Sequence, residues 1–315
     1  MVAQAPSPAS NVEDAGEGAC ATKKPRPRRT SRKLTPPLTY LSHFGLKEFP
    51  FGLTPDTAYF FPGGGAQGAL NTLLVALESG EGLIKIVGEV GSGKTLLCRH
   101  LLNRLEKAGW AAAYIPNPHL SPEGLQLALL EELDGKAAKG RALTRALEER
   151  LLALAQEGKR AVALIDEAQA APLETLEALR LITNLETEKR KLLQIVLFGQ
   201  PELDAKLADP GVRQIRGRIA FHDQITPLAA SETPAYLMHR TRHAGAGETL
   251  FHPGAARTLH RASRGVPRLL NILAHKALLL AYGEGRAQVL PRHVILAGRD
   301  TPGCRLNWFE KVFPR

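Results

Sequence analysis

One short segment limits the folds open to this chain more than any other: Gly88-Glu89-Val90-Gly91-Ser92-Gly93-Lys94-Thr95. An apolar run at 83–87 leads into it, and an amphipathic stretch at 94–108 follows it. Glycines, a lysine and a hydroxyl residue at this spacing, between a strand and a helix, are typical of a loop that binds phosphate at a helix N-terminus. The segment therefore predicts a nucleoside triphosphate site on an α/β sheet.

Each residue type in this loop has a physical reason to be there. Gly91 and Gly93 allow positive backbone dihedral angles and a close approach to the phosphates. Lys94 brings a positive charge to the β and γ phosphates, and the hydroxyl of Thr95 can ligate Mg²⁺. A glycine-rich turn that binds nothing is the alternative, and the flanking strand and helix argue against it. We expect residues 88–95 to bind the phosphates.

A second polar signal follows the apolar run at 161–165, where Asp166 and Glu167 come directly after the strand. Ligands of open α/β sheets bind at the carboxyl ends of the strands. Asp166 is predicted to hold Mg²⁺ through water, and Glu167 to act as the general base that polarises the attacking water. Alone, the pair could be a strand end that meets solvent. Together with the phosphate loop, it indicates hydrolysis.

The order of apolar and amphipathic stretches predicts the fold class. Strands are expected at 83–87, 111–115, 161–165, 192–198 and 220–224. Helices are expected between them, at 94–108, 121–132, 141–157, 172–184 and 201–207. In the helix at 141–157, leucines recur at spacings of four and three, which places them on one face. Alternation of this kind predicts a parallel sheet flanked by helices.

The pattern changes after residue 227, where only helical stretches remain. These are 232–244, 253–263, 267–282 and 291–297, with glycines at the breaks between them. We therefore predict a disordered basic tail at 1–38, an α/β ATPase domain at 39–228 and a small all-helical lid domain at 229–315.

Net charge points to a polyanionic partner. The chain carries +10, and residues 1–38 hold seven basic and three acidic side chains among many Pro, Ala and Ser. Such a segment cannot bury enough apolar area to order itself. Its basic run is either an arm for nucleic acid or acidic lipid, or a solvated tail. Part of the remaining charge belongs to the predicted nucleotide site, so the charge does not by itself indicate DNA.

The cysteines, histidines and apolar runs bear on metal binding, cellular compartment and membrane insertion. Cys20, Cys98 and Cys304 lie far apart and show no metal-ligand spacing, as in a reducing compartment. His239 and His243 could share a helical face, but no third ligand adjoins them, and Cys98 is expected to be a small buried residue. No run reaches the roughly 18 apolar residues that a spanning helix needs. A soluble cytoplasmic protein is predicted.

Several further motifs carry a resemblance to a known family. They are the segments 40–51 and 53–56, the motif Asp166-Glu167-Ala168-Gln169, residues 198–203, which begin with Phe-Gly-Gln-Pro, and residues 265–271, which begin with Gly-Val-Pro-Arg. With the phosphate loop, they resemble the AAA+ ATPases of the branch that contains ExeA (general secretion pathway protein A) and the MSHA pilus biogenesis protein MshM. The resemblance covers about residues 40–300. ExeA-type chains continue into a membrane span and a peptidoglycan-binding region, so we expect a protein closer to MshM.

The resemblance implies further site residues. Gln200 matches the polar residue that helps to hold the attacking water, although it could simply begin a turn. Arg268 matches the lid arginine that reaches the γ phosphate, with a surface arginine as the alternative. Arg213, Arg216 and Arg218 are candidates for the arginine finger that reaches into the site of a neighbouring subunit. Arg218 is expected first and Arg213 second, and each of the three could be a solvated loop charge. Adenine is expected near residues 51–55.

The resemblance also implies a function. An oligomeric ATPase that uses ATP and Mg²⁺ would support assembly of a type IV (MSHA-like) pilus or a secretion apparatus. Its partners would be copies of itself and inner-membrane assembly proteins, which would place it at the periphery of that membrane. The alternative is a DNA-associated helper ATPase of the TniB or MuB transposition type, because those proteins share the core and this chain is basic. Tight, salt-sensitive and ATP-dependent duplex binding would favour that alternative.

Overall fold

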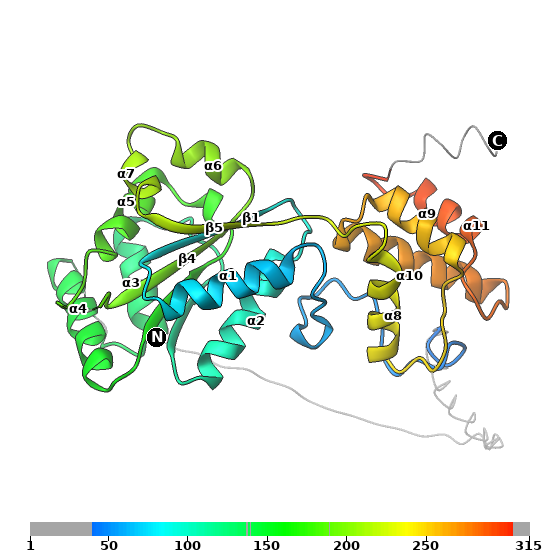
Figure 1. Ribbon diagram of the computed structural model, residues 1–315, viewed down its shortest axis with the longest axis horizontal. Helices are drawn as coiled ribbons and strands as arrows, with labels where there is room; N and C mark the ends of the chain where they lie inside the picture. Colours follow the sequence, from blue (N-terminus) through cyan, green and yellow to red (C-terminus); the bar gives the residue numbers. More distant parts are fainter. Residues whose placement is uncertain (1–39, 137, 139, 189, 305–315) are drawn as a thin grey trace, which may run out of the picture. The chain divides into compact units, whose positions relative to one another are not determined.

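The structure is a computed structural model that describes residues 40–136, 138, 140–188 and 190–304 (Figure 1). The described residues belong to one compact unit. The tail predicted at 1–38 and the last residues of the predicted lid domain lie outside the described residues. Within the described ranges, no helix has both the length and the apolar character needed to cross a bilayer.

Five strands form a single parallel sheet. They are β1 Leu83–Gly88, β2 Ala111–Ile115, β3 Ala161–Ile165, β4 Leu193–Gly199 and β5 Ile219–Ile225. Their order across the sheet is β2-β3-β4-β1-β5, and each neighbouring pair is parallel. The predicted fold class is confirmed, and the predicted runs differ from the strands only at their ends. Because β1 lies between β4 and β5, the loop that follows β1 is flanked on both sides.

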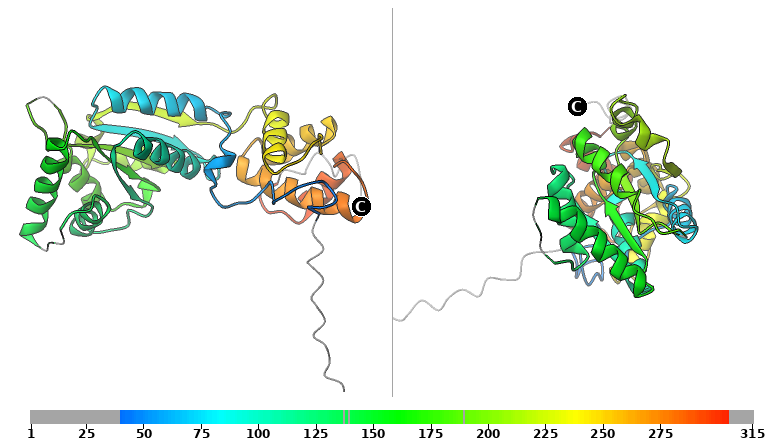
Figure 2. Two further views of the ribbon diagram at one scale, coloured as in Figure 1. Left: turned by 90° about the horizontal axis from the view of Figure 1, so that it is seen from below. Right: turned by 90° about the vertical axis from the view of Figure 1, so that its left-hand side faces the viewer.

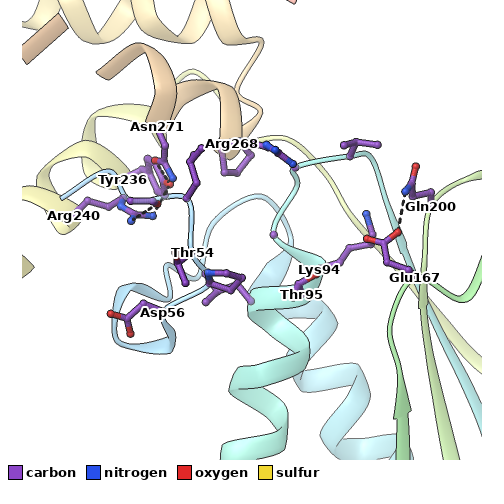
Figure 3. Close-up of a pocket in the computed structure, with 18 residues that line it drawn as sticks. Thr54, Asp56, Lys94, Thr95, Glu167, Gln200, Tyr236, Arg240, Arg268 and Asn271 are labelled. Atoms are coloured by element: carbon purple, nitrogen blue, oxygen red, sulfur yellow. Dashed lines mark hydrogen bonds between the residues drawn. The ribbon is translucent and has the colours of Figure 1, made fainter. Parts of the chain in front are cut away.

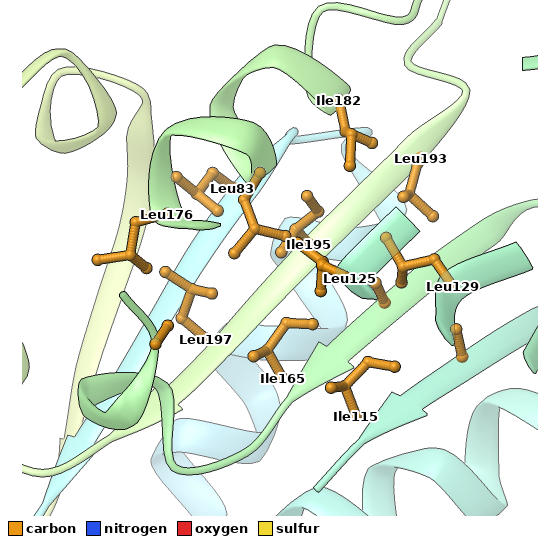
Figure 4. Packing of buried hydrophobic residues seen from close by; sticks show 14 of the residues in the cluster. Leu83, Ile115, Leu125, Leu129, Ile165, Leu176, Ile182, Leu193, Ile195 and Leu197 are labelled. Atoms are coloured by element: carbon orange, nitrogen blue, oxygen red, sulfur yellow. The ribbon is translucent and has the colours of Figure 1, made fainter. Parts of the chain in front are cut away.

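One face of the sheet is covered by α3 Pro122–Glu132, α4 Arg141–Gln156 and α5 Leu173–Ile182, with the short helices α6 Glu202–Leu207 and α7 Arg213–Arg216. Figure 4 shows Ile115, Ile165 and Ile195 of the sheet against leucines of α3 and α5. The predicted leucine face of α4 is buried here, at Leu143, Leu147, Leu151 and Leu154. This packing fixes the strand that carries Asp166.

The other face of the sheet packs against α1 Ala66–Glu78 and α2 Lys94–Lys107. Helix α2 begins directly after the phosphate loop and buries Leu97, Cys98 and Leu101 against the sheet, as predicted for Cys98. Helix α1 was not predicted. A short 3-10 helix, Thr57–Tyr59, precedes it in the chain. The phosphate loop thus stands on a strand and a helix that are both fixed in the core.

A group of four helices follows β5: α8 Thr233–His243, α9 Pro253–Ser263, α10 Pro267–Gly283 and α11 Pro291–Arg299. They appear in yellow to red in Figures 1 and 2 and share one apolar core. Each of them begins with proline at its first or second position, where the missing N–H group costs no helical hydrogen bond. The helices predicted at 232–244, 253–263, 267–282 and 291–297 are therefore present.

The segment 40–51 also packs into the core of these four helices. Tyr40, Phe44, Leu46 and Phe51 are buried there. The Tyr40 hydroxyl lies 2.8 Å from Nδ1 of His275. The chain then enters the α/β sheet region through residues 52–56 and leaves it again near Leu228, whose N–H donates to the carbonyl of Gly265 at 3.0 Å. Two chain segments therefore connect the sheet region with the helical group.

Candidate nucleotide site

The phosphate loop joins the end of β1 to the start of α2. Gly93 is the N-cap of α2 with φ of 102°, and Gly91 has φ of 79°. Both angles lie in the left-handed region that favours glycine. A Cβ atom added at Gly91 would lie 2.7 Å from Cβ of Arg268, whereas no atom lies within 4 Å of a Cβ added at Gly93. The loop is therefore open at Gly93, at the helix N-terminus where a phosphate could approach.

Lys94 is buried inside this loop. Lys94 is only 5% exposed. Its Nζ donates to the carbonyl of Gly88 at 2.7 Å and to that of Glu89 at 3.0 Å. Burial lowers the pKa of its ammonium group, although the carboxylates of Glu167 and Asp166 act to raise it. A buried cation with only carbonyl partners is poised to exchange them for anionic oxygens. Lys94 is thus a buried cation whose hydrogen bonds, among the described residues, go to neutral carbonyls of the loop.

Asp166 lies at the end of β3, beside the first turn of α2. It is 2% exposed, accepts the N–H of Glu167 at 2.9 Å and is hydrogen-bonded by the hydroxyl of Thr95. Burial raises the pKa of this carboxyl group, and the two hydrogen bonds oppose that rise. A carboxylate and a hydroxyl are oxygen groups of the kind that Mg²⁺ takes from a protein when phosphates and water complete its shell. Among the described residues, no cluster of three His, Cys, Asp or Glu could hold a metal alone.

Glu167 is held in place by two amide side chains. Nε2 of Gln200 donates to its Oε2 at 2.9 Å, and Nε2 of Gln169 donates to the same oxygen. Burial acts to raise the pKa of Glu167, but these hydrogen bonds and the charge of Lys94 outweigh it, so the pKa is lowered. The backbone of Glu167 has φ of 50°, which is strained for a residue other than glycine. The result is an ionised carboxylate in a fixed position.

Gln169 is a site residue that the sequence analysis did not assign. Its Oε1 accepts the N–H of Gln200 at 3.0 Å, while its Nε2 donates to Glu167. One carboxamide therefore joins the end of β4 to the residue after β3. The signal in the sequence is the position of Gln169 in the Asp-Glu-Ala-Gln motif, two residues after the predicted general base.

Replacement of Gln200 by leucine should change the pH dependence of catalysis. The variant loses one of the donors that lower the pKa of the Glu167 carboxyl group, so this pKa should rise. A general base must be deprotonated, and the acidic limb of the pH profile of kcat/KM should therefore move to higher pH, with a plateau about tenfold lower. Gln67→Leu, at an exposed position of α1, is the matched control and should leave the profile unchanged. An unshifted acidic limb in Gln200→Leu would contradict the assignment of Glu167.

A cavity of about 280 Å³ lies between the phosphate loop, residues 52–56 and helices α8 and α10 (Figure 3). Its lining includes Lys94, Thr95, Glu167, Gln200 and Arg268 from the predicted set. Arg268 lies in the first turn of α10, and its N–H donates to the carbonyl of Gly91 at 3.2 Å. The structure thus brings most of the predicted residues together in one cavity.

Other predicted residues lie elsewhere. Arg213, Arg216 and Arg218 are exposed and do not line the cavity of their own chain. Ser92 is buried, and its Oγ has no hydrogen-bond partner among the described residues. In the segment expected to hold adenine, residues 52–55 line the cavity, together with Asp56. Phe51 does not, because it is buried in the helical core.

Three polar cavity residues from the helical group were not predicted: Tyr236, Arg240 and Asn271. His239 and His243 lie on α8 with Tyr236 and Arg240. The ring of His243 contacts that of Tyr59 edge to face, and His239 packs against Phe61. Neither histidine lines the cavity. The helical group therefore contributes more polar side chains to the cavity than Arg268 alone.

The parallel sheet in the order β2-β3-β4-β1-β5, with its flanking helices and the helical group that follows, is an AAA-type fold. Residues 77–207 match the AAA domain family. General secretion pathway protein A of Aeromonas hydrophila is 39% identical over 269 residues, which are 84% of this chain and 49% of that protein. The resemblance to the ExeA branch of the AAA+ proteins is confirmed. The chain spans about half the length of this relative.

Solved structures show the same fold at low identity. The ORC2 protein of Aeropyrum pernix, in ADPNP and ADP complexes, has a TM-score of 0.62 and 17% identity, over 84% of this chain and 74% of that chain. Cdc6p of Pyrobaculum aerophilum has a TM-score of 0.63 and 18% identity, over 80% of this chain and 70% of that chain. The architecture of sheet and following helices is thus one that known AAA+ proteins adopt.

Proposed function

We propose that this chain binds ATP with Mg²⁺ and hydrolyses it. The observation that carries the proposal is the position of Glu167, an ionised carboxylate that Gln200 and Gln169 hold at the cavity with Lys94. A fixed base beside a phosphate loop suits attack of water on a phosphoryl group better than storage of a nucleotide. The pattern Asn-Lys-x-Asp of guanine recognition is absent from the sequence, which favours adenine.

In the proposed reaction, each residue has one task. The loop amides and Lys94 bind the phosphates and stabilise the negative charge that develops on them. Glu167 accepts a proton from the attacking water, and Gln200 keeps the carboxylate oriented toward it. Thr95 and Asp166 would hold Mg²⁺, which when bound neutralises phosphate charge. Arg268 joins α10 to the phosphate loop, so that the helical group responds to the triphosphate.

We further propose that ATP turnover supports assembly of a secretion apparatus or a type IV (MSHA-like) pilus. The support is the similarity to general secretion pathway protein A over 84% of this chain. The protein would act as a homo-oligomer at the inner membrane through partner proteins, with Arg218, or else Arg213 or Arg216, completing the site of a neighbouring copy. The proposal also includes the division of the chain into an α/β ATPase domain at 39–228 and a lid domain at 229–315.

One experiment tests this role against the DNA-associated alternative. The ATPase rate of the pure protein is measured with and without duplex DNA, at low and moderate salt. We expect the rate to change less than about twofold with DNA, and we expect the protein to co-purify with inner-membrane assembly proteins from its own cells. Salt-sensitive stimulation by DNA would overturn the secretion or pilus role and support the helper ATPase. No turnover under any condition would overturn the hydrolytic function itself.

A further inference from the structure

We infer that Asn271 donates a hydrogen bond to the nucleoside part of the bound nucleotide, and that Tyr236 positions it for this contact. The inference rests on the proposed function, because it concerns the other end of the same cavity. Figure 3 shows Asn271, Tyr236 and Arg240 grouped on one side of Lys94, with Glu167 and Gln200 on the other. The phosphate end and the end at Asn271 are therefore distinct.

Arg240 fixes the direction of the hydrogen bonds in this group. It is 6% exposed, and its guanidinium donates to the carbonyl of Pro50 at 2.5 Å and to the hydroxyl of Tyr236 at 3.2 Å. The guanidinium carbon also lies 4.6 Å from the ring centroid of Tyr59. A guanidinium has donors only, so the Tyr236 oxygen can act only as the acceptor in this contact. The single proton of Tyr236 remains free to be donated elsewhere.

That proton goes to Asn271. The Tyr236 hydroxyl donates to Oδ1 of Asn271 at 2.7 Å. Burial raises the pKa of Tyr236, so the hydroxyl stays protonated and remains a donor at neutral pH. A carboxamide whose oxygen is occupied by a donor must present its NH₂ group on the other side. The orientation of Asn271 therefore follows from Arg240 through Tyr236.

The NH₂ group of Asn271 is left with no partner among the described residues, and the side chain lines the cavity. Asn271 lies one helical turn after Arg268 on α10, and Arg240 contacts the carbonyls of Pro50 and Gly52, next to the segment that lines the cavity. A ligand there must offer an acceptor rather than a donor. Ring nitrogens of a base and oxygens of a ribose are acceptors of this kind and extend away from the phosphates.

The test compares two probes, ADP and inorganic tripolyphosphate, which shares the phosphates but has no nucleoside. Asn271→Asp keeps the acceptor for Tyr236 and removes the donors, and Asn271→Leu removes the donors without adding charge. We expect Asn271→Leu to bind ADP about tenfold more weakly, as for one lost hydrogen bond, and to bind tripolyphosphate within about twofold of the native protein. The charge added in Asn271→Asp repels both probes, so this variant should lose more affinity for ADP than for tripolyphosphate. Thermal unfolding without ligand should confirm that both variants fold.

The alternatives give different results. Equal weakening of ADP and tripolyphosphate would mean a structural or charge effect and would overturn the inference, as would unchanged ADP binding in both variants. A native protein that binds neither probe would instead overturn the proposed nucleotide site. Tyr236→Phe tests the positioning role: it should weaken ADP binding about threefold alone, and add nothing in the double variant with Asn271→Leu. Additive losses would show that Tyr236 does not act through Asn271.

Discussion

Replacement of Lys94 by alanine is expected to abolish nucleotide binding and, with it, turnover. The Lys94 ammonium group is buried and, among the described residues, donates hydrogen bonds only to the carbonyls of Gly88 and Glu89, so the phosphates of a bound nucleotide would be its counter-charge. Removal of one partner of a buried charge pair typically costs about 3–5 kcal/mol, which corresponds to a loss in affinity of at least ~100-fold. Isothermal titration with ATP and with ADP measures this loss directly.

Lys107→Ala is the matched control, because Lys107 lies at the exposed end of the same helix. It removes an equal charge without touching the cavity, and affinity should stay within about twofold of the native value. If Lys94→Ala bound ATP as tightly as this control, the phosphate loop would not be the nucleotide site.

Glu167→Gln is expected to separate binding from hydrolysis. Glutamine keeps the size of the side chain but cannot accept a proton from the attacking water, so kcat should fall by about 10²- to 10⁴-fold. Lys94 and the loop glycines are unchanged, and ATP binding should therefore be retained. Single-turnover kinetics, together with the affinity for ATP, give both values on one sample.

Glu174→Gln serves as the control for this variant, since Glu174 is exposed in the first turn of α5. Its turnover should match that of the native protein. Native turnover in Glu167→Gln would exclude Glu167 as the general base, and native turnover in both Lys94→Ala and Glu167→Gln would remove the whole assignment of the site.

The sheet could be predicted because its strands are buried on both faces. Runs such as 161–165 are apolar throughout, and the phosphate loop fixes the identity of the elements before and after it. Strand β5 is less regular, because it lies at the edge of the sheet and alternates between partly buried and exposed residues. The core positions of α4 followed directly from the leucine spacing.

Helix α1 could have been predicted and was not. Ala66, Ala69, Leu70, Leu73 and Leu77 form one buried face with helical spacing. The glycines just before it and Gly68 within it suggest a loop when the stretch is considered locally. Burial against the sheet outweighs the low helix propensity of a single glycine.

Some residues of the site could be predicted from local sequence, and others come together only through the fold. Lys94, Thr95, Asp166 and Glu167 follow directly from two short motifs. By contrast, Arg240 donates a hydrogen bond to the carbonyl of Pro50, which lies 190 positions earlier in the sequence, and only the fold brings the two residues together. Helical spacing marks Tyr236 and Arg240 as neighbours on one face of α8, but a buried cation is against expectation for such a face.

The packing of residues 40–51 into the helical group has a consequence for biosynthesis. Tyr40 and its partner His275 are separated by 235 positions, and the whole α/β sheet is encoded between them. At translation rates of roughly 5–20 residues per second, synthesis from Tyr40 to His275 takes about 10–50 s. During this time the helices that cover the aromatic side chains of the segment have not all been made. All five strands of the sheet are synthesised during that interval, whereas residues 40–51, which precede them in the chain, are covered only after the four helices have followed.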